Sequence, residues 1–372
     1  MPGPRHVAFN ALFLDPGVSG GPETYLRGLV PALADEFPGV ELTVLTTRRG
    51  ARALRADGWT DFARIRHFPV DEGQRERRLL AEQVLAAVAA RRWRADVLHS
   101  LASTGPVRPV TRSVVTLHDV TFTRIRTFSA VTTLAMRAVV AGAAHSADAL
   151  ISGSVAARDD VCAVLGLDPA RFTVVPHGAG RAPVVAPAPA GPLRERLGLG
   201  DRRVVLCVGA IRPHKNQRVL VEALARLPED VSLVLAGVHE LGAGELAARA
   251  AELGVGERLH MPGYLPDAAV EALWAMAACL AFPTLGEGFG LPVLEAMRRG
   301  VPVACSDIPV LREVGGDVAR YFPPADAAAA AAAIAAAMGD AGAADRGRAR
   351  AARYSWAAAA RGTHEAYERA LA

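Results

Sequence analysis

Lysine is almost absent from this sequence. The chain holds 42 lysine and arginine residues, and Lys215 is the only lysine among them. A lysine kept where arginine supplies all other positive charge indicates a site that needs a compact positive charge. A phosphate is a ligand that suits such a charge. The alternative interpretation is an ordinary solvated lysine in the first turn of a helix.

Cysteine is also scarce. The four cysteines stand far apart, with no C-x-x-C pair and no histidine nearby at zinc-ligand spacing. Three of them lie in or beside apolar runs, which predicts buried free thiols in a reducing cytoplasm. D-x-D-like carboxylate pairs and His/Cys clusters are missing too, so we predict no metal site. The cysteines are Cys162, Cys207, Cys279 and Cys305.

Long hydrophobic runs are missing as well. The apolar run before Asp15 is too short for a signal peptide, and no later run reaches about 18 uninterrupted apolar residues. The sequence therefore predicts a cytoplasmic protein that is soluble or at most peripheral on the inner face of the membrane. The segment QRERRLLAEQVLAAVAARRWR is a basic helical stretch compatible with such a contact, although a solvated helix face is the commoner reason for such a pattern and the interpretation we favour from the sequence.

The net charge is a modest +4, and the arginines are interleaved with aspartate and glutamate. Nothing here calls for a nucleic-acid partner, whereas small anionic ligands remain compatible. With 372 residues, 51% of them hydrophobic, the chain is long enough for two domains with separate cores.

Short apolar runs alternate with helical stretches through the first half, for example over residues 23–33 and 82–93. This alternation is typical of a parallel sheet with crossover helices. We expect an N-terminal α/β domain over residues 1–185. Its predicted strands lie in HVAFNALFL, VELTVLTT, ADVLHS, SVVTLHD, ALISGS and FTVVPHG.

The proline-, alanine- and glycine-rich stretch over residues 180–200 predicts an exposed connector without helix or strand, with the linker proper at 186–200. A second α/β domain is expected over residues 201–354. Its predicted strands lie in RRVVLCVGA, VSLVLAG, RLHMPGYL, ACLAFPT, VPVACSD and ARYFPP.

The end of the chain is predicted to be helical. Alanine is the best helix former, so residues 325–338 are expected to form a helix despite their low complexity. A last helix is expected over residues 355–372, with Ser355 as its N-cap.

The most informative motif is FPTLGEGFGLPVLEAM, residues 282–297. A strand is expected to end near Phe282, and Pro292 falls in the first turn of a helix. Glycines in the intervening loop let the backbone approach a ligand, and the helix N-terminus offers N–H groups to a phosphate. Glu287 and Glu295 flank that position and could accept hydrogen bonds from hydroxyls, which indicates a sugar or ribose. The alternative is a capped helix with a glutamate favourable to its dipole.

Two further motifs lie in the first half. Gly20 and Gly21 stand between a strand and a helix begun by Pro22, where the backbone could approach a phosphate or an acceptor; a plain tight turn is the alternative. His118 and Asp119 follow a predicted strand, at the edge where ligands gather in parallel sheets. A lone histidine is more often structural, and Asp119 could simply orient it.

At these residues the chain resembles the retaining GT-B glycosyltransferases of family 4. Their paired glutamates around a G-F-G-L-P core are present as EGFGLPVLE, and the flanking RRGVPVACSDIPVLREVGGDVARYFPPAD is similar to the family over nearly all residues from Arg202 onward. GYLPD at residues 263–267 resembles the base-binding turn, and VGAIRPHKN resembles the loop that holds the diphosphate. There the chain has Ala210 where arginine is commoner, like a subgroup that includes many mannosyltransferases.

The resemblance implies a role for each matching residue. Glu287 contacts donor-sugar hydroxyls, Glu295 takes the ribose hydroxyls, Lys215 binds the diphosphate, and Arg212 joins it only by proximity. His118 lies beside the reacting sugar, whereas His177 and Gly178 match a position that we interpret as structural. Together the implied donor-binding residues are Gly20, Gly21, Arg212, Lys215, Gly263, Tyr264, Glu287, Gly288, Phe289, Gly290, Leu291 and Glu295.

The implied fold is GT-B, with two Rossmann-like domains facing each other across a cleft and the last helix crossing back onto the first domain. The implied reaction transfers a sugar from a nucleotide diphosphate sugar to an acceptor hydroxyl of a glycan, lipid or small molecule, with retention and without a cofactor or metal. The subgroup favours GDP-mannose, and a UDP-sugar is possible. Alternatives are a GT-B epimerase or phosphorylase, or a non-catalytic binding protein.

Overall fold

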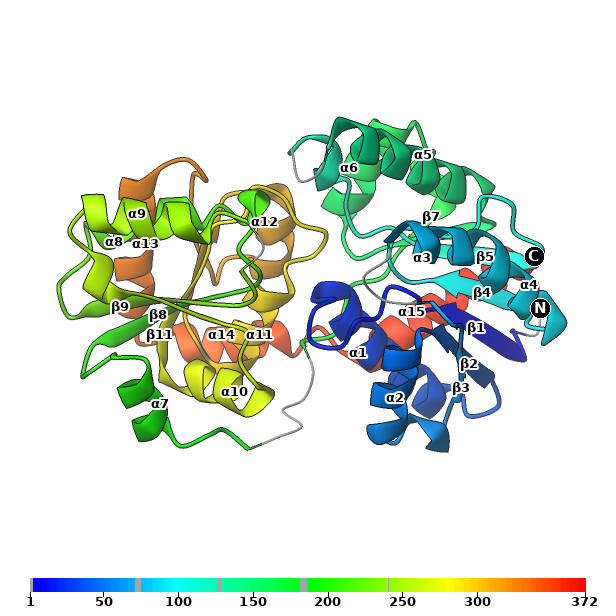
Figure 1. The fold of residues 1–372 in the computed structure, drawn as a ribbon, viewed down its shortest axis with the longest axis horizontal. Coiled ribbons are helices and arrows are strands. Elements are labelled where there is room, and N and C mark those ends of the chain that lie inside the picture. The colour runs from blue at the N-terminus through cyan, green and yellow to red at the C-terminus, as the bar shows by residue number, and fades with distance from the viewer. Residues whose placement is uncertain (1–2, 71–74, 126–128, 181–185, 240) are drawn as a thin grey trace. The chain divides into compact units, whose positions relative to one another are not determined.

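The computed structural model describes residues 3–70, 75–125, 129–180, 186–239 and 241–372, which divide into two compact units (Figure 1). Unit 1 comprises the described residues up to Arg124, those from Ser129 to Gly178, and the C-terminal stretch Tyr354–Ala372. Unit 2 is formed by Ile125 and the described residues from Ala179 to Arg353. Each unit is built on its own parallel sheet.

Unit 1 contains a seven-stranded parallel sheet in the order β3-β2-β1-β4-β5-β6-β7. Apolar side chains from one face of the sheet pack against α1, α2 and α15, and those from the other face pack against the helices from α3 to α6. The strands are β1 (His6–Asn10), β2 (Glu41–Thr46), β3 (Arg64–His67), β4 (Val97–Ser100), β5 (Arg112–Thr116), β6 (Ala149–Ser152) and β7 (Phe172–Val174). The helices are α1 (Gly21–Glu36), α2 (Arg48–Ala56), α3 (Arg75–Ala81), the π-helical turn η2 (Glu82–Ala86), α4 (Ala87–Arg92), α5 (Ala130–Ser146), α6 (Val155–Leu165) and α15 (Trp356–Leu371), with 3-10 turns at Trp59–Asp61, Thr121–Thr123 and Pro169–Arg171.

Unit 2 contains a six-stranded parallel sheet in the order β10-β9-β8-β11-β12-β13. Helices α8, α9 and α13 pack on one face through apolar side chains. The strands are β8 (Arg203–Val208), β9 (Val231–Ala236), β10 (Leu259–Gly263), β11 (Ala277–Phe282), β12 (Val303–Ser306) and β13 (Arg320–Phe322). The helices are α7 (Ala190–Arg196), α8 (Gln217–Leu224), α9 (Ala243–Glu252), α10 (Asp267–Met276), α11 (Leu291–Arg299), α12 (Pro309–Gly315), α13 (Ala327–Met338) and α14 (Ala343–Ala351), with 3-10 turns at Pro213–Lys215 and Gly256–Arg258.

Several helix starts follow from N-cap chemistry in the sequence. The side chain of Ser355 accepts a hydrogen bond from the backbone N–H of Ala358 and begins α15, as expected. Asp326 accepts from two backbone N–H groups and begins the alanine-rich α13, which confirms the helix expected over residues 325–338.

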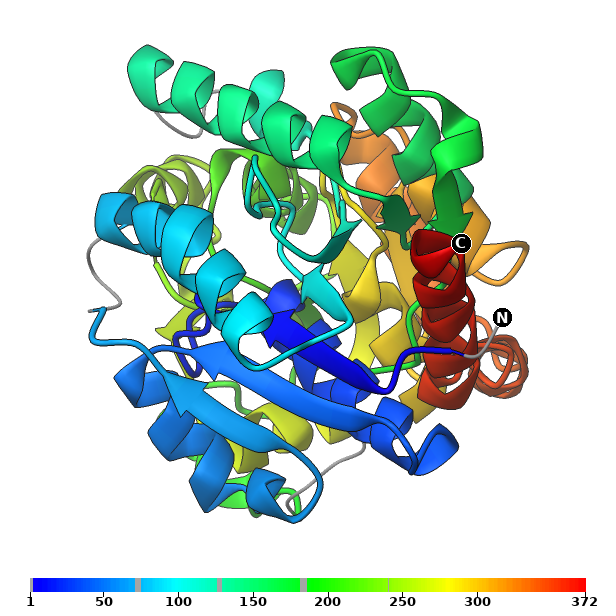
Figure 2. The same cartoon turned by 90° about the vertical axis from the view of Figure 1, so that its right-hand side faces the viewer.

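The last helix belongs to unit 1, where α15 lies against α1 (Figure 2). The close approach depends on Gly28, because a Cβ at this residue would lie 2.0 Å from Cε2 of Trp356. The phenol of Tyr367 in α15 also reaches the sheet through a hydrogen bond of 2.8 Å with Nδ1 of His99. Helix α15 is therefore part of the core of unit 1.

A chain of buried polar groups continues from that contact. His99 Nε2 lies 2.8 Å from the hydroxyl of Thr116, which lies 3.2 Å from the hydroxyl of Tyr25 in α1. Burial lowers the pKa of His99 to about 3 and raises the pKa of Tyr25 to about 12, so both groups are neutral over the physiological range. These hydrogen-bonded side chains link α1, β5, β4 and α15 without burying a charge.

The two parallel α/β units confirm the fold class expected from the sequence. Residues 181–185 of the connector expected over 180–200 lie outside the described residues, and the expectation that the connector holds no helix is wrong, because α7 forms in it. Its Leu193 is buried, and the side chain of Arg194 donates to the carbonyls of Gly200 and Arg202. These contacts with residues outside the helix outweigh a composition typical of a connector. Strand β3 had no apolar run to reveal it, because only Ile65 of its residues is buried.

No single helix in the described part of the chain is long and apolar enough to cross a bilayer. One pair of helical pieces, Ala327–Met338 and Ala343–Leu371, has sufficient length and composition only when the two are counted together, and they are bent by 94° at the break.

The packing of α15 gives a stability prediction. Gly28→Ala should lower the free energy of unfolding of unit 1 by about 1–3 kcal/mol, because the new methyl group overpacks against Trp356. Gly244→Ala in α9 is the control, since a Cβ there meets nothing within 4 Å and alanine favours a helix by up to about 1 kcal/mol. Urea unfolding followed by tryptophan fluorescence measures both. An unchanged midpoint for Gly28→Ala would contradict the packing account.

Candidate functional site

The loops that follow β8 and β11 meet at the carboxyl edge of the sheet of unit 2. These strands are neighbours, and β9 lies on the other side of β8, so the chain leaves β8 and β11 toward opposite ends of the sheet. Ligands in open parallel sheets bind outside such a switch point. Lys215 stands in the first loop and Glu287 in the second.

Lys215 occupies the end of the 3-10 turn Pro213–Lys215, directly before α8. The turn is held by Asn216, which adopts a left-handed conformation with φ 54°. The Asn216 amide donates hydrogen bonds to the carbonyls of Pro283 (3.2 Å) and Pro324 (2.7 Å). Asn216 thereby attaches the lysine loop to the segments that follow β11 and β13, a role that the sequence did not reveal.

Nζ of Lys215 forms an ion pair with Oε1 of Glu287. Both side chains are mostly shielded from solvent, and Nζ lies 5.3 Å from the centroid of the Phe282 ring. The hydroxyl of Thr284 donates to the carbonyl of His214 (3.1 Å) and so joins the same two loops. The structure therefore brings together the lysine and the loop glutamate that the sequence placed in one site.

Helix α11 begins immediately after this loop. Its N-cap is Gly290, with φ 92°, and a Cβ there would lie 2.6 Å from Cδ2 of Leu311. Glycine is thus required both by the conformation and by the space. Pro292 lies in the first turn, as expected, and the first N–H groups of a helix have no partner within the helix, which suits an anion beside Phe289 and Leu291. Gly288 lies in the loop between Glu287 and Phe289.

Glu295 lies one turn further along α11 and is half-buried. Desolvation raises the pKa of its carboxyl to about 7, against the opposing effect of the guanidinium of Arg299. Arg299 itself pairs with Glu271. Gly180 packs on this carboxylate, since a Cβ at residue 180 would lie 2.6 Å from Cγ of Glu295.

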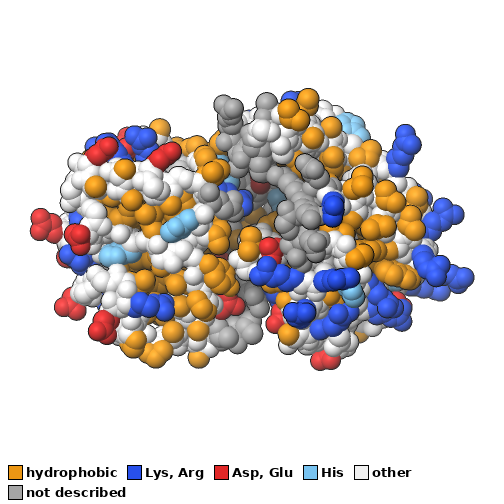
Figure 3. All heavy atoms as spheres, in the orientation of Figure 1, with side chains coloured by type: hydrophobic (Ala, Val, Ile, Leu, Met, Phe, Trp, Pro, Cys, Tyr) orange, Lys and Arg blue, Asp and Glu red, His pale blue; other side chains and the backbone are white. Residues whose placement is uncertain are grey.

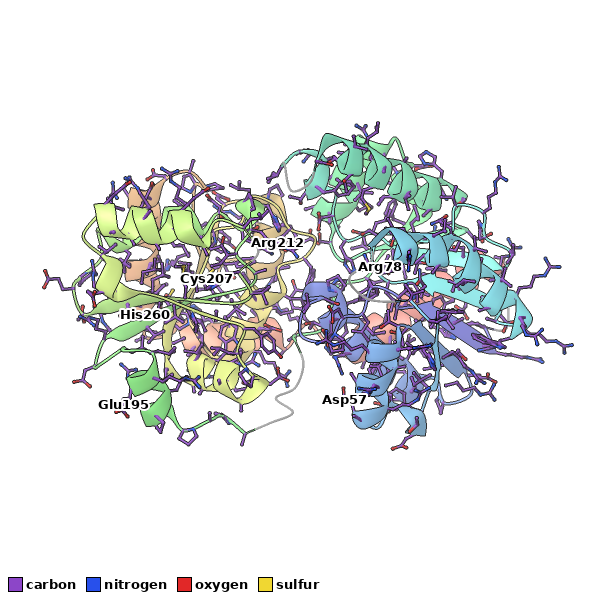
Figure 4. The ribbon with its side chains drawn as sticks, in the orientation of Figure 1. Asp57, Arg78, Glu195, Cys207, Arg212 and His260 are labelled. Carbon is purple, nitrogen blue, oxygen red and sulfur yellow. The ribbon has the colours of Figure 1, made fainter. Side chains whose placement is uncertain are left out.

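Three more candidate residues surround the edge of the same sheet. Gly263 ends β10 with φ 74°, its carbonyl accepts from the N–H of Gly237, and the following Tyr264 is 58% exposed. An exposed tyrosine ring offers a face for stacking. Arg212 caps the 3-10 turn that carries Lys215 and is half-buried (Figure 4).

The candidate residues of unit 1 lie after β1 and β5. Gly20 begins α1 with φ 60°, and a Cβ at either Gly20 or Gly21 would meet nothing within 4 Å. Glu23 holds the loop before them, because its carboxylate accepts from the N–H of Gly17 (3.0 Å) and from Arg27 (2.7 Å). The open space at both glycines leaves backbone available to a ligand.

His118 is half-buried and held on two sides. Its Nε2 lies 2.7 Å from the carbonyl of Leu101, and its backbone N–H donates to the hydroxyl of Ser103 (3.1 Å). A carbonyl can only accept, so Nε2 carries the proton. Burial lowers the pKa of the ring, which is therefore neutral and has Nδ1 as an acceptor. The carboxylate of Asp119 accepts from the N–H of Thr121, so it caps a turn.

The environment of His177 and Gly178 agrees with a structural role. The His177 ring is buried, 4.5 Å from Tyr25 and stacked 6.1 Å from Trp356 between ring centroids. A Cβ at residue 178 would lie 2.5 Å from the Trp356 ring. Both residues shape the packing of α15.

Among the residues that the structure describes, no group of three or more histidine, cysteine, aspartate or glutamate side chains converges as a metal site. The four cysteines are free and buried, as the sequence predicted.

Comparison with known protein families gives two matches. Residues 192–355 match the model described as "Glycosyl transferases group 1", and residues 19–179 match "Glycosyltransferase Family 4". The two matches together cover most of both units.

Curated relatives include an O-antigen chain mannosyltransferase B of Escherichia coli, 34% identical over 49% of this chain and 50% of the relative. An MMP alpha-(1->4)-mannosyltransferase of Mycolicibacterium hassiacum is 31% identical over 60% of this chain and 54% of the relative. A D-inositol 3-phosphate glycosyltransferase of Xylanimonas cellulosilytica is 29% identical over 71% of this chain and 60% of the relative. The chain thus spans between half and three fifths of the length of these relatives.

Solved structures share the fold at low identity. HepE of Anabaena, determined in complex with UDP and glucose, has a TM-score of 0.74 and 19% identity, covering 97% of this chain and 98% of that one. Sucrose-phosphate synthase of Thermosynechococcus elongatus has a TM-score of 0.75 and 21% identity, with 98% of each chain covered. With its two parallel α/β units and its two family matches, the chain belongs to the GT-B glycosyltransferases of the family 4 type.

Proposed function

We propose that the protein is a retaining glycosyltransferase that moves a sugar from a nucleotide diphosphate sugar to an acceptor hydroxyl. The observation that carries this proposal is the pairing of Lys215 with Glu287 beside the N-terminus of α11. An ammonium and a helix N-terminus suit a diphosphate, and a carboxylate suits sugar hydroxyls. The acceptor is a hydroxyl of a glycan, a lipid or a small molecule.

The donor we favour is GDP-mannose. Two of the relatives are named mannosyltransferases, and a third, from Mycolicibacterium smegmatis, is named as GDP-mannose-dependent. The competing donor is a UDP-sugar, because HepE was solved with UDP-glucose. Thermal-shift measurements with GDP, UDP and their sugars distinguish the two, since a ligand of the native state raises Tm according to its affinity.

The proposed reaction needs charge stabilisation on the leaving diphosphate. Lys215, the first turn of α11 and Arg212 supply it, in the place that a metal ion takes in other enzymes. The leaving diphosphate then accepts the proton of the acceptor hydroxyl on the face where the new bond forms, so that configuration is retained. Transfer is accordingly expected to continue in EDTA, without a cofactor.

His118 is proposed to contact the reacting sugar. Its neutral ring has the proton on Nε2, so Nδ1 accepts from a hydroxyl without adding a charge. The location we propose is the cytoplasm, where the four buried cysteines remain reduced.

Substitutions of Glu287 and Glu295 should have different effects on transfer and on nucleotide binding. Glu287→Ala is expected to abolish transfer while nucleotide diphosphate still binds, because its contact belongs to the sugar. Glu295→Gln is expected to weaken nucleotide binding and to remove a dependence on pH. With the carboxyl pKa at about 7, affinity of the wild type for GDP-mannose should rise between about pH 6 and pH 8, as the carboxylate becomes ionised and accepts the ribose hydroxyls.

Calorimetric titrations and initial rates measure these effects, with Glu245→Ala on the exposed side of α9 as a control that should change neither. Near-normal turnover in both site variants would show that the donor site lies elsewhere.

Lys215→Arg should lower turnover by about 10²-fold or more, with Tm nearly unchanged. The broad guanidinium replaces a compact ammonium, and one misplaced donor to a developing oxyanion costs roughly 2.7–4 kcal/mol. The matched control is the reverse exchange, Arg218→Lys, at an exposed position of the next helix, where substitutions usually stay within about ±0.5 kcal/mol. Full activity of Lys215→Arg would mean that the lysine has no special role.

His118→Ala should lower turnover by about 10²-fold or more with little loss of stability, as expected for a group positioned at the reacting sugar. His145→Ala, on the exposed side of α5, is the control. Steady-state rates and thermal melts are measured together. A variant that unfolds without a specific kinetic defect would assign His118 to the core instead.

A further inference from the structure

The helical segment from Arg77 to Arg94 exposes large aliphatic side chains. Four of them face solvent along one side: Leu80 is 68% exposed, Val84 53%, Leu85 39% and Val88 56%. They recur at about one helical turn, and the wider π-helical turn η2 allows the consecutive Val84 and Leu85 both to reach the surface. We call these four residues the aliphatic face.

The residues on the buried side of the same segment are of the kind that a solvated helix exposes or leaves small. It consists of small alanines and one carboxylate, Glu82, whose exposed fraction is 1%. A helix that served only the core of unit 1 would bury its leucines and valines and expose its glutamate. The inverted pattern indicates that the aliphatic face has a partner of its own.

Polar contacts fix this orientation. Oε2 of Glu82 accepts from the hydroxyl of Thr104 (2.7 Å), and the Gln83 amide donates to the carbonyl of Gly105 (2.7 Å) and accepts from the N–H of Val107 (2.8 Å). The helix therefore cannot roll to bury its aliphatic face. Val107, 38% exposed, extends the apolar surface beside Gln83.

Within the segment from Arg77 to Arg94 the exposed charged side chains have one sign. Glu82 is the only acidic side chain between Arg77 and Arg94, all of whose residues the structure describes, and it is buried. Arginines frame the face at both ends, and Figure 3 shows blue and orange spheres side by side at the end of unit 1 where Figure 1 labels α4. The exposed arginines are Arg77, Arg91, Arg92 and Arg94.

We propose that the aliphatic face docks on an anionic lipid bilayer. Aliphatic side chains between flanking arginines are the arrangement by which a helix lies in the membrane interface, with its apolar side in the acyl boundary and its cations at the headgroups. Trp93, whose ring lies 5.5 Å below the guanidinium of Arg66, adds an aromatic group of the kind enriched at that depth. The docking goes beyond the proposed transfer reaction and does not depend on it.

The test is co-sedimentation of the full chain with phosphatidylcholine vesicles, with and without phosphatidylglycerol. The wild type should bind vesicles that contain phosphatidylglycerol and lose most binding at high salt. Leu80→Gln with Val84→Gln should weaken the partition coefficient about tenfold or more, since each buried apolar group contributes to the insertion. Arg91→Gln with Arg92→Gln should also weaken it about tenfold or more.

The matched controls make the same types of substitution at exposed residues outside the aliphatic face. Val155→Gln with Leu241→Gln removes two other exposed aliphatic side chains, and Arg52→Gln with Arg196→Gln removes two other exposed arginines. Both controls should bind like the wild type. Thermal melts confirm that every variant is folded.

Three outcomes would overturn the proposal. The first is no binding of the wild type to anionic vesicles, and the second is equal losses in the test and control variants. The third is a dimer in sedimentation velocity that Leu80→Gln with Val84→Gln disperses, because the face would then bind a second copy of the chain.

Discussion

The ion pair between Lys215 and Glu287 joins the two loops on which the candidate donor site of unit 2 depends. Each partner is mostly shielded from solvent, so loss of either would leave the other as a poorly compensated charge. Hydrogen bonds from Asn216 and Thr284 join the loop after β8 to the loop after β11, and Asn216 also donates to Pro324, which follows β13. In the proposed function the ammonium of Lys215 pairs with the diphosphate of the donor. The carboxylate of Glu287 is then free to accept hydrogen bonds from the hydroxyls of the donor sugar.

Unit 1 depends on a different kind of constraint, since its centre holds neutral polar groups in place of an ion pair. His99, Thr116, Tyr25 and Tyr367 form a hydrogen-bonded chain that ties the last helix of the protein to the sheet. The same aromatic region surrounds His118, whose ring lies 5.3 Å from Tyr25 and 5.6 Å from His177 between centroids. The C-terminal helix, remote in sequence, thus helps to shape the environment of the histidine that we propose to contact the reacting sugar.

The sequence predicted those features that local chemistry decides. The alternation of apolar runs gave the two parallel sheets, Ser355 gave the start of α15, and Pro292 after Gly290 gave the start of α11. It could not predict α7, because its proline- and glycine-rich residues become helical only through contacts such as those of Leu193 and Arg194. It also could not predict that Glu82 is buried while its aliphatic neighbours are exposed, because Thr104, the partner that turns this helix, lies on a separate loop.

Because Lys215 is the only lysine in the sequence, the assignment of the donor site to the loops after β8 and β11 can be tested directly. Protein grown with ¹⁵N-lysine has a single side-chain ammonium, so one Nζ signal reports on Lys215 alone. We expect this signal to shift when GDP, or UDP if that is the donor nucleotide, is added, and the guanosine or uridine nucleoside alone to leave it in place. A Nζ signal that stays unchanged at saturating concentrations of both nucleotide diphosphates would contradict the assignment of the donor site to the loops after β8 and β11.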